Sequence, residues 1–389
     1  MPRTLVASTL AALLGLAGCD ERPRPPELPS EPERPPKLDL DAALGEPAEA
    51  GAFDAAAEAK KLVAELRSAK LDVAPRRVPT QRLAFGKDRL AQLTESELVL
   101  RDTKDMKELA RLPVTGPRRV VTLADGSVLV AAQADVWHVP KDPKKAERYA
   151  RVPLFPDSLL LGDRREKRRL WVHHGLDPTL FPYELGEAGR VETLDLIELR
   201  EADQKGIALL KDGSYVYTAG AKLERFFPGG KRWSLGLPPG AEIWRVLTTR
   251  RLDEIWLARS DGKLVLAQLS DSALTVKKTL ELPGSFDIAT NDTEVALLSL
   301  ESRPADKAAA PDAGLPARAW RLLVLDADGK ELFSAELPLD AAGASEDWVR
   351  ELTKNRGVAL APSQPLVAVG GPSFLGVWNY RDKSQVLAP

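Results

Sequence analysis

The sequence predicts an all-β fold in which one small unit is repeated about seven times, and three observations support this prediction. From about Gln81 onward, apolar and polar residues alternate, which is the period of β-strands. Seven apolar stretches stop at or near a proline, and the early stops recur about every 40 to 45 residues. Glycine-containing turn signals separate the stretches. Short strands, hairpin turns and this period together predict a β-propeller of about seven blades over residues 81–389.

Two strands of each predicted blade can be located in the sequence, the last strand and the strand before it. The seven stops, the third of which lacks the proline, are Leu112-Pro113, Val152-Pro153, Leu194-Asp195, Leu237-Pro238, Leu282-Pro283, Leu337-Pro338 and Leu387-Ala388-Pro389. The preceding strands are rich in β-branched, leucine or aromatic residues and cover 98–100, 136–139, 180–183, 223–226, 264–266, 322–325 and 377–380. Turn signals centred on Asp-Gly occur at 124–127, 211–214 and 260–263.

One such unit cannot cover both faces of its own small sheet, so each blade needs a neighbour on either side, and closing the ring removes the exposed ends. The region 81–389 resembles WD40-like and quinoprotein-like propellers in its period and strand pattern. It departs from a strict WD40 motif, because Leu100-Arg101-Asp102, Leu325-Asp326 and Trp378-Asn379 are only echoes of the Trp-Asp pair. The resemblance implies a ring of small antiparallel sheets.

Two blades are longer than the others, and each contains an insertion. Residues 303–316 have the composition of a surface loop and interrupt a hairpin of the sixth blade. In the seventh blade, Ser345 is the expected N-cap of a short helix that Gly357 ends. The exposed edge of this helix would present Trp348 and Arg350, residue types enriched at binding hot spots, as candidate partner contacts. The alternative is that Trp348 packs the helix onto the propeller.

The N-terminus carries a secretory signal that ends at the only cysteine of the chain. Arg3 supplies a positive charge, the apolar stretch 4–16 is too short for the ~20 residues of a membrane-spanning helix, and small residues precede Cys19. Leu16-Ala17-Gly18-Cys19 resembles the lipobox of bacterial lipoproteins. That resemblance implies that residues 1–18 are a signal peptide and that the thiol of Cys19 is lipidated, which anchors the protein to the inner or the outer membrane.

Two further segments are predicted between Cys19 and the propeller. Residues 19–50 are rich in proline and charge and cannot build a core, so they form a disordered linker, which is either an extended spacer or a leader without a required length. Residues 51–80 contain an amphipathic helix, from Ala52 to Lys70, and the lead-in to the first blade. The small apolar residues and mixed charges of this helix favour packing on the propeller over contact with a membrane.

Composition and charge argue against a nucleic-acid partner and against stabilisation by disulfides. The chain has 389 residues, 44% of them hydrophobic, and 55 basic against 57 acidic residues give a net charge of −2. That balance supplies no field to attract nucleic acid, so no nucleic-acid partner is predicted. With Cys19 modified, no thiol remains for a disulfide, and packing and hydrogen bonds must stabilise the fold.

The sequence offers few residues for chemistry, and we predict no catalytic residue, no metal site and no cofactor. The three histidines, His138, His173 and His174, do not form a ligand set, because adjacent residues on a strand point to opposite faces. Residues 326–329 and 228–231 are interpreted as turns rather than as a calcium loop and a phosphate loop. The basic run 164–169 is interpreted as a hairpin tip, with electrostatic contact to anionic lipid or to an acidic partner as the alternative.

These observations favour one class of function and keep a second. The first is a membrane-anchored envelope lipoprotein, with its propeller most simply placed in the periplasm, that serves as an interaction or scaffolding module for other envelope proteins. The second is a propeller enzyme, similar to lactonases, glycosidases or quinoproteins, with its site in the central channel. Several His, Asp, Glu or Arg side chains converging on one pocket would favour the enzyme. Small-ligand sensing and the oligomeric state are left open.

Overall fold

The structure of the chain is a computed structural model. It describes residues 57, 60–62, 64–65 and most of 81–388. Residues outside the description within that range are 124, 134, 151, 153, 156–157, 163–167, 175–176, 200–201, 211, 228–229, 238–241, 250, 252, 271–272, 282–284, 292, 303–317 and 338–356. The chain divides into two compact units, Met1–Phe53 and Asp54–Pro389, and all described residues belong to the second. The described part contains no helix long and apolar enough to cross a membrane.

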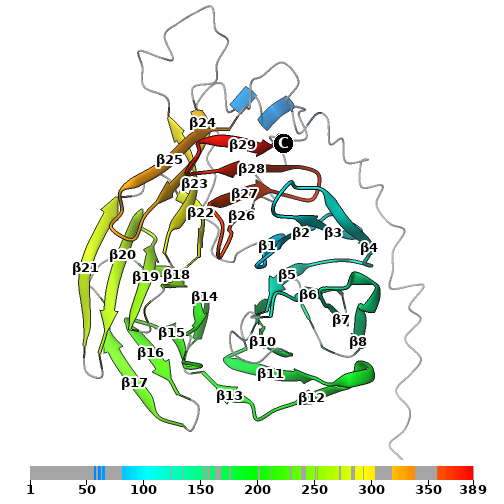
Figure 1. Ribbon diagram of the computed structural model, residues 1–389. Coiled ribbons are helices and arrows are strands. Elements are labelled where there is room, and N and C mark those ends of the chain that lie inside the picture. The colour runs from blue at the N-terminus through cyan, green and yellow to red at the C-terminus, as the bar shows by residue number, and fades with distance from the viewer. Residues whose placement is uncertain are drawn as a thin grey trace, which may run out of the picture. The chain divides into compact units, whose positions relative to one another are not determined.

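The described strands form seven separate antiparallel sheets, numbered here as blades 1 to 7 in chain order, which stand around a central axis (Figure 1). The first strand of each blade is the innermost: β1 (Leu83–Phe85), β5 (Arg119–Thr122), β9 (Leu159–Gly162), β14 (Ala202–Leu209), β18 (Ile243–Thr248), β22 (Ser285–Thr290) and β26 (Gly357–Leu360). The second strands are β2 (Arg89–Leu93), β6 (Val128–Ala131), β10 (Arg169–His173), β15 (Tyr215–Ala219), β19 (Glu254–Arg259), β23 (Val295–Ser302) and β27 (Leu366–Gly370).

The third and fourth strands complete each blade toward the outside of the ring. The third strands are β3 (Glu97–Asp102), β7 (Asp135–Val139), β11 (Thr179–Leu185), β16 (Lys222–Phe226), β20 (Lys263–Leu269), β24 (Arg318–Leu325) and β28 (Leu375–Asn379). The outer strands are β4 (Glu108–Pro113), β8 (Glu147–Ala150), β12 (Val191–Thr193), β17 (Arg232–Gly236), β21 (Leu274–Glu281), β25 (Glu331–Glu336) and β29 (Ser384–Leu387). Blade 3 has an additional short strand, β13 (Ile197–Glu198), and the 3-10 turns are η1 (Pro143–Lys145) and η2 (Glu187–Gly189).

The prediction of an all-β propeller with about seven blades is confirmed, and the last two strands of each blade lie where the sequence placed them. Every predicted stop falls at or just after the outer strand of one blade, and every predicted penultimate strand overlaps a third strand. The three Asp-Gly signals are hairpin turns, and residues 326–330 close the hairpin between β24 and β25. Residues 303–317 stand between the paired strands β23 and β24, so the insertion does interrupt a hairpin.

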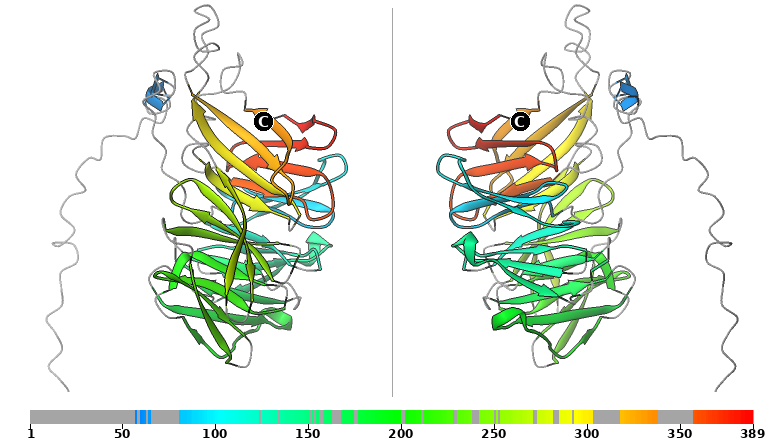
Figure 2. Two further views of the ribbon diagram at one scale, coloured as in Figure 1. Left: turned by 90° about the vertical axis from the view of Figure 1, so that its left-hand side faces the viewer. Right: turned by 90° about the vertical axis from the view of Figure 1, so that its right-hand side faces the viewer.

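Burial changes from the axis to the rim because of the way the blades pack. Second strands such as β2 and β27 are buried at every position, since each is covered by a neighbouring blade on both faces. Outer strands such as β4 and β21 are mostly exposed. Views from the side show the blades stacked face to face around the ring (Figure 2).

The hydrophobic core is divided between the blades, and this division shows how the ring closes. Among the described residues, the buried apolar side chains form seven clusters, and each cluster is shared by one pair of neighbouring blades. An open row of seven blades would have only six such interfaces. The seventh joins blade 7 to blade 1, where Leu83, Phe85 and Leu90 pack against Ala368, Leu375 and Val377.

Closure uses side-chain packing and hydrogen bonds instead of an exchanged strand. Blade 1 consists of β1–β4 and blade 7 of β26–β29, so among the described strands neither blade contains one from the other end of the chain. The buried Gln92 of β2 donates its Nε2 to the carbonyl oxygens of Gly371 and Phe374, at 2.9 and 3.1 Å. One side chain of the first blade therefore satisfies two backbone acceptors of the last.

Part of the predicted N-terminal helix belongs to the same unit. Residues 57, 60–62 and 64–65 are helical, and Lys61 Nζ lies 3.9 Å from Glu65 Oε1, one turn apart on the polar side. Leu62, a residue of the predicted apolar face, packs against the cluster shared by blades 6 and 7. This contact agrees with packing on the propeller. Residues 1–50, including Cys19, lie outside the described residues.

Candidate functional site

The central channel holds a candidate site, and all seven inner strands line it. Its cavity measures about 350 Å³, within the range of ~300–1,000 Å³ typical of small-molecule sites. Most lining side chains are aliphatic because the inner strands also supply the cores between blades. The lining side chains that are half-buried are Gln81, Arg82, Ala84, Val121, Thr122, Leu161, Arg245, Ala289 and Thr290.

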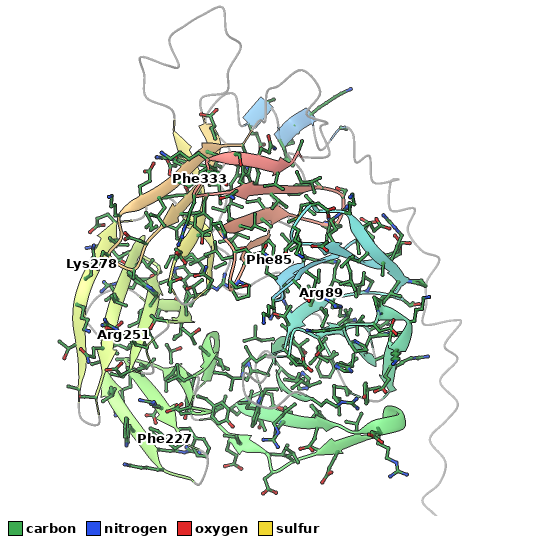
Figure 3. All side chains as sticks on the ribbon, in the orientation of Figure 1. Phe85, Arg89, Phe227, Arg251, Lys278 and Phe333 are labelled. Atoms are coloured by element: carbon green, nitrogen blue, oxygen red, sulfur yellow. The ribbon has the colours of Figure 1, made fainter. Side chains whose placement is uncertain are left out.

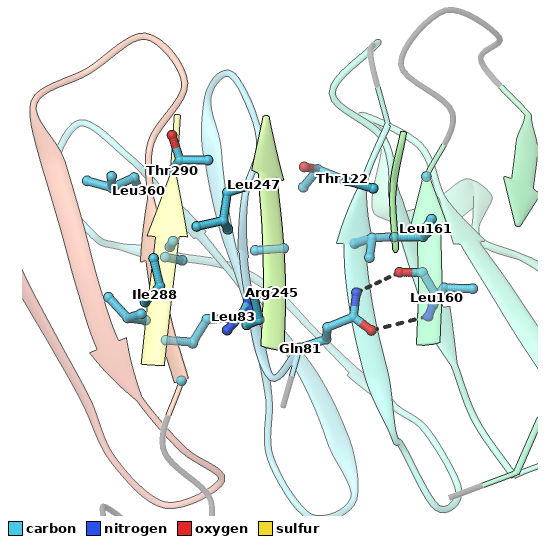
Figure 4. Close-up of a pocket in the computed structure, with 18 of the residues that line it drawn as sticks. Gln81, Leu83, Thr122, Leu160, Leu161, Arg245, Leu247, Ile288, Thr290 and Leu360 are labelled. Carbon is cyan, nitrogen blue, oxygen red and sulfur yellow. Dashed lines mark hydrogen bonds between the residues drawn. The ribbon is translucent and has the colours of Figure 1, made fainter. Parts of the chain in front are cut away.

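Charge is confined to one end of the channel. Among the lining residues, the charged ones are Arg82, Arg245 and Asp287. Arg82 immediately precedes β1, and Arg245 and Asp287 are the third residues of β18 and β22. They therefore lie at one level, where the inner strands begin. Thr122, Thr248 and Thr290 are the last residues of β5, β18 and β22 and mark the other end. Figure 4 shows Arg245 and Gln81 toward one end and Thr290 and Thr122 toward the other.

Asp287 joins three blades at the charged end. Its Oδ1 lies 2.5 Å from Arg245 Nη1 of blade 5 and accepts from the backbone N–H of Ile288 at 2.9 Å. Its Oδ2 accepts from the N–H of Val358 in blade 7 at 3.2 Å. The carboxylate is 3% exposed, and these three donors compensate the loss of water around it.

Gln81 makes a similar junction on the opposite side of the axis. Its Nε2 donates to the carbonyl of Leu160 at 2.6 Å, while its Oε1 accepts from the N–H of Leu160 at 3.2 Å, so the amide pairs with β9 as a backbone group would. Its own carbonyl accepts from Val120 N–H at 2.7 Å. These bonds need a backbone φ of 48°, which is unusual for a residue with a side chain.

The histidines occupy structural positions. His138, in the third strand of blade 2, is 4% exposed, and burial lowers its pKa from the usual 6.5. His173 is fully buried at the end of β10, and His174 bonds through Nδ1 to Ser158 Oγ at 2.8 Å. Within the described part of the chain, no group of three or more His, Cys, Asp or Glu residues has the arrangement of a metal site.

The two faces of the ring differ in the lengths of their connections. We call the face where inner strands begin the loop face; it carries the connections from each outer strand to the next blade and those between second and third strands. The longest connections between described strands, 303–317 and 338–356, both start and end there. The other face, the turn face, carries short hairpin turns such as Asp125-Gly126-Ser127 and Asp212-Gly213-Ser214.

An exposed aromatic residue projects from the loop face between blades 2 and 3. Phe155 is 56% exposed, and its ring meets the ring of His174 edge-on at a centroid distance of 5.0 Å. The backbone N–H of Phe155 donates to Ser158 Oγ at 2.8 Å, and Ser158 N–H donates back to the Phe155 carbonyl at 3.0 Å. Arg118 holds the adjacent Leu154 carbonyl at 2.6 Å. The phenyl ring is thus exposed, while the backbone N–H and carbonyl of Phe155 are both hydrogen-bonded to the buried Ser158.

A second aromatic group lies at the turn face of blade 4, away from the channel, where Figure 3 labels Phe227. The Arg225 guanidinium lies 4.7 Å from the Phe227 ring and 5.1 Å from the Trp233 ring. Its Nη2 also donates to Asp212 Oδ2 at 2.7 Å and its Nε to Ser214 Oγ at 3.0 Å. Arg225 is buried, so this group stabilises the hairpin.

The structure tests some of the predicted site residues and leaves others untested. Trp348, Arg350 and residues 164–167 of the basic run lie outside the described residues. The last two arginines of that run are engaged within the molecule, with Arg168 Nη1 3.6 Å from Glu147 Oε2 and Arg169 Nη2 3.0 Å from Glu184 Oε2. Sequence reasoning missed the channel residues and Phe155, since only the ring closure and loop packing give them a shared location.

Solved structures of other proteins share the fold of this chain. No family model and no curated protein matches the sequence. Among solved structures, the β-propeller domain of Myceliophteria thermophila Cps50 (Swd1) has a TM-score of 0.53 at 13% identity and covers 78% of this chain and 97% of that one.

Two further structures agree with this likeness. Kluyveromyces lactis Hsv2 has a TM-score of 0.51 at 11% identity, covering 77% of this chain and 92% of its own. Saccharomyces cerevisiae Sqt1 has a TM-score of 0.51 at 8% identity, covering 79% and 84%. At these identities the likeness concerns the fold alone. The chain thus has the fold of a WD40-like seven-bladed β-propeller.

Proposed function

We propose that this protein is a lipid-anchored lipoprotein of the bacterial cell envelope whose propeller is a protein-interaction module, and that partners dock on its loop face. The observation that carries the proposal is the placement of Phe155 on a hydrogen-bonded turn of the face that also carries the longest connections. Rigid exposed aromatic residues bind partners at a low cost in conformational entropy. The lipobox-like sequence at Cys19 supports the anchor.

The geometry favours an interaction module over an enzyme. A catalytic site needs an acid, base or nucleophile free to meet a substrate, and in the described channel lining the one carboxylate, Asp287, is held by three donors. The exposed aromatic residue lies outside the channel, on the loop face.

Site-specific crosslinking in the native envelope tests the docking face. A photoreactive phenylalanine analogue replaces Phe155 in one variant and the exposed Lys330, on the turn face between β24 and β25, in the control. We expect a discrete crosslinked protein from position 155 and none from position 330. Equal crosslinking from both positions, or none from position 155, would contradict docking on the loop face.

The anchor is tested separately with Cys19→Ser. We expect the variant to keep the thermal unfolding curve of the propeller but to leave the membrane fraction, because the acyl chains supply the binding free energy, about 0.8 kcal/mol per buried methylene. Membranes are washed in high salt so that electrostatic adhesion does not retain the protein. Continued sedimentation with membranes under these conditions would show that the anchor is wrong, whatever the docking face does.

A further inference from the structure

We propose, on the basis of the lipid anchor proposed above, that the hairpin between β16 and β17 contacts the anionic surface of the anchoring membrane. We call Phe226, Phe227, Lys231, Arg232 and Trp233 the blade 4 tip. They flank the turn that joins the third and outer strands of blade 4, on the turn face and away from the channel (Figure 3). The turn face is opposite the loop face, so a lipid contact and a docked partner can be present at once.

The blade 4 tip carries aromatic rings that the core does not use. Phe227 and Trp233 are half-buried, their ring centroids lie 4.6 Å apart, and neither belongs to the described core clusters. The indole N–H of Trp233 has no hydrogen-bond partner among the described residues. Rings with an apolar body and a polar N–H are enriched where lipid meets water.

The equivalent hairpins of other blades show that the turn itself does not require Phe227. In blades 1, 5, 6 and 7 the hairpin between the third and outer strands starts with a side-chain oxygen that accepts a turn N–H, from Asp102, Ser270, Asp326 and Asn379. The backbone of Phe227 bonds as that of Asp326 does, since each N–H donates to a lysine carbonyl four residues on, at 2.8 and 3.0 Å. A phenyl ring accepts no such side-chain bond, so the turn does not explain this ring.

The two cations of the tip have no acidic partner in the described part of the chain. Lys231 is exposed, and no described side chain forms an ion pair with it. Arg232 donates its Nη2 to the backbone carbonyl of Glu198 at 2.7 Å, which satisfies a donor but leaves the positive charge without a counter-ion. Arg225 does not add to this charge, because Asp212 pairs with it at 2.7 Å.

Rings and cations together favour a lipid surface over an acidic protein. The Lys231 ammonium lies 5.0 Å from the Trp233 ring, so the ring can enter the interface while the ammonium reaches the phosphates of the headgroups. Residues 19–50, the predicted linker, reach up to about 100 Å at roughly 3.1 Å per residue, and the anchor therefore permits the contact. Because the protein is already tethered, a contact of modest affinity is enough.

Vesicle sedimentation of the unlipidated mature chain tests the contact. The chain from residue 19 with Cys19→Ser keeps the whole unit to which the described residues belong. We expect it to bind vesicles of phosphatidylglycerol and phosphatidylcholine in equal parts at least tenfold more tightly than vesicles of phosphatidylcholine alone, and NaCl to release it. No preference for the anionic vesicles would overturn the proposal. The assay contains neither the lipid anchor nor a protein partner, so its failure leaves both of those proposals standing.

Charge reversal at two equivalent positions locates the contact on the ring. Lys231→Glu is expected to weaken binding to the anionic vesicles at least tenfold, because each basic residue near an anionic surface contributes about fivefold and the reversal adds repulsion. Lys330→Glu is the matched control, since Lys330 is exposed and has the same place in the hairpin of blade 6. Thermal unfolding checks that both variants fold. Equal losses of binding would mean that general charge on the turn face is responsible and would contradict the site.

Quenching of tryptophan fluorescence by lipids with brominated acyl chains tests whether the rings enter the interface. We expect brominated anionic vesicles to quench part of the fluorescence of the Cys19→Ser chain, and this part to be lost in Trp233→Phe, which keeps a ring beside Arg225. Salt-sensitive binding without quenching, or quenching unchanged by Trp233→Phe, would overturn the proposal. The first of these results would favour an acidic protein, held by charge alone, as the ligand of the tip.

Discussion

At the scale of single residues, two equivalent turns show how little sequence is needed to fix a hairpin. In both Asp125-Gly126-Ser127 and Asp212-Gly213-Ser214, the aspartate Oδ1 accepts from the serine N–H at 2.9 Å and from its Oγ at 2.6 Å. The central glycine has φ 82° in each. The two blades differ in the residue that their third strand brings to the same place in the sequence. In blade 4, Arg225 follows the turn and bonds to Asp212, whereas in blade 2 the residue at the same distance from Asp125 is His138.

His138 makes the stability of the fold depend on pH. Burial lowers its pKa in the folded state from the usual 6.5, so between pH 6.5 and the lower folded value the unfolded chain binds a proton that the folded chain does not. This contribution to stability is present above pH 6.5 and is lost as the pH falls. Both ring nitrogens are buried without a hydrogen-bond partner among the described residues.

We therefore expect His138→Leu to flatten this dependence. From pH 7 to pH 5.5 the wild-type free energy of unfolding should fall by more than that of the variant, because only the wild-type chain takes up this proton on unfolding. Urea denaturation at the two pH values measures both differences. Parallel losses in the two proteins would show that His138 does not titrate with folding.

At the scale of elements, the hairpin between β24 and β25 shows how a turn can also be part of a blade interface. Asp326 Oδ1 accepts from the N–H groups of Asp328 and Lys330, and Gly329 has φ 74°. A Cβ on Gly329 would lie 2.6 Å from Cδ2 of Leu280, on the outer strand of the neighbouring blade. Gly126 has the same kind of φ, but a Cβ there would meet nothing within 4 Å.

This pair of glycines separates backbone strain from crowding. Gly126→Ala should cost about 1–2 kcal/mol of unfolding free energy, the cost of a left-handed conformation for a residue with a Cβ. Gly329→Ala should cost about 1–3 kcal/mol more, because overpacking against Leu280 is added. Thermal or urea unfolding of the two variants measures the difference. Equal losses of unfolding free energy in the two variants would mean that Leu280 moves aside without a measurable cost.

Much of the element scale was predictable from the sequence, and the reason is local. Alternation, Asp-Gly turns and proline stops act through a few neighbouring residues, so β3, β7 and β28 could be located without a structure. The channel could not be located in this way. Arg245 and Asp287 lie 42 residues apart and meet only because blades 5 and 6 are adjacent in the closed ring.

At the scale of the whole molecule, closure between blades 7 and 1 is the step that completes the core. Each of the other interfaces joins blades that follow one another in the chain, whereas this one joins its two ends. Closing so long a loop costs entropy, and the packing of Leu83, Phe85 and Leu90 on blade 7 offsets it. Gln92 adds the two hydrogen bonds that match the blades in register.

Gln92→Leu tests that role. Removing the amide takes one donor from the Gly371 carbonyl and one from the Phe374 carbonyl, which still accepts from the Gly371 N–H at 3.0 Å. We therefore expect a loss of about 1–3 kcal/mol in unfolding free energy. Hydrogen exchange should accelerate first in blades 1 and 7. Gln268→Leu is the control, because its amide donates to Asp253 within blade 5. Uniform acceleration around the ring would mean that closure is not the weak interface.

The sequence by itself predicted the repeat, about seven blades, the last two strands of each blade and the positions of the turns, because these depend on side-chain period and on residues that adopt particular backbone angles. Tertiary structure alone decided that Asp287 joins three blades, that Gln92 closes the ring and that the channel has one charged end. Such contacts join residues far apart in the chain. Their partners are set by which blades become neighbours, and no local pattern encodes that.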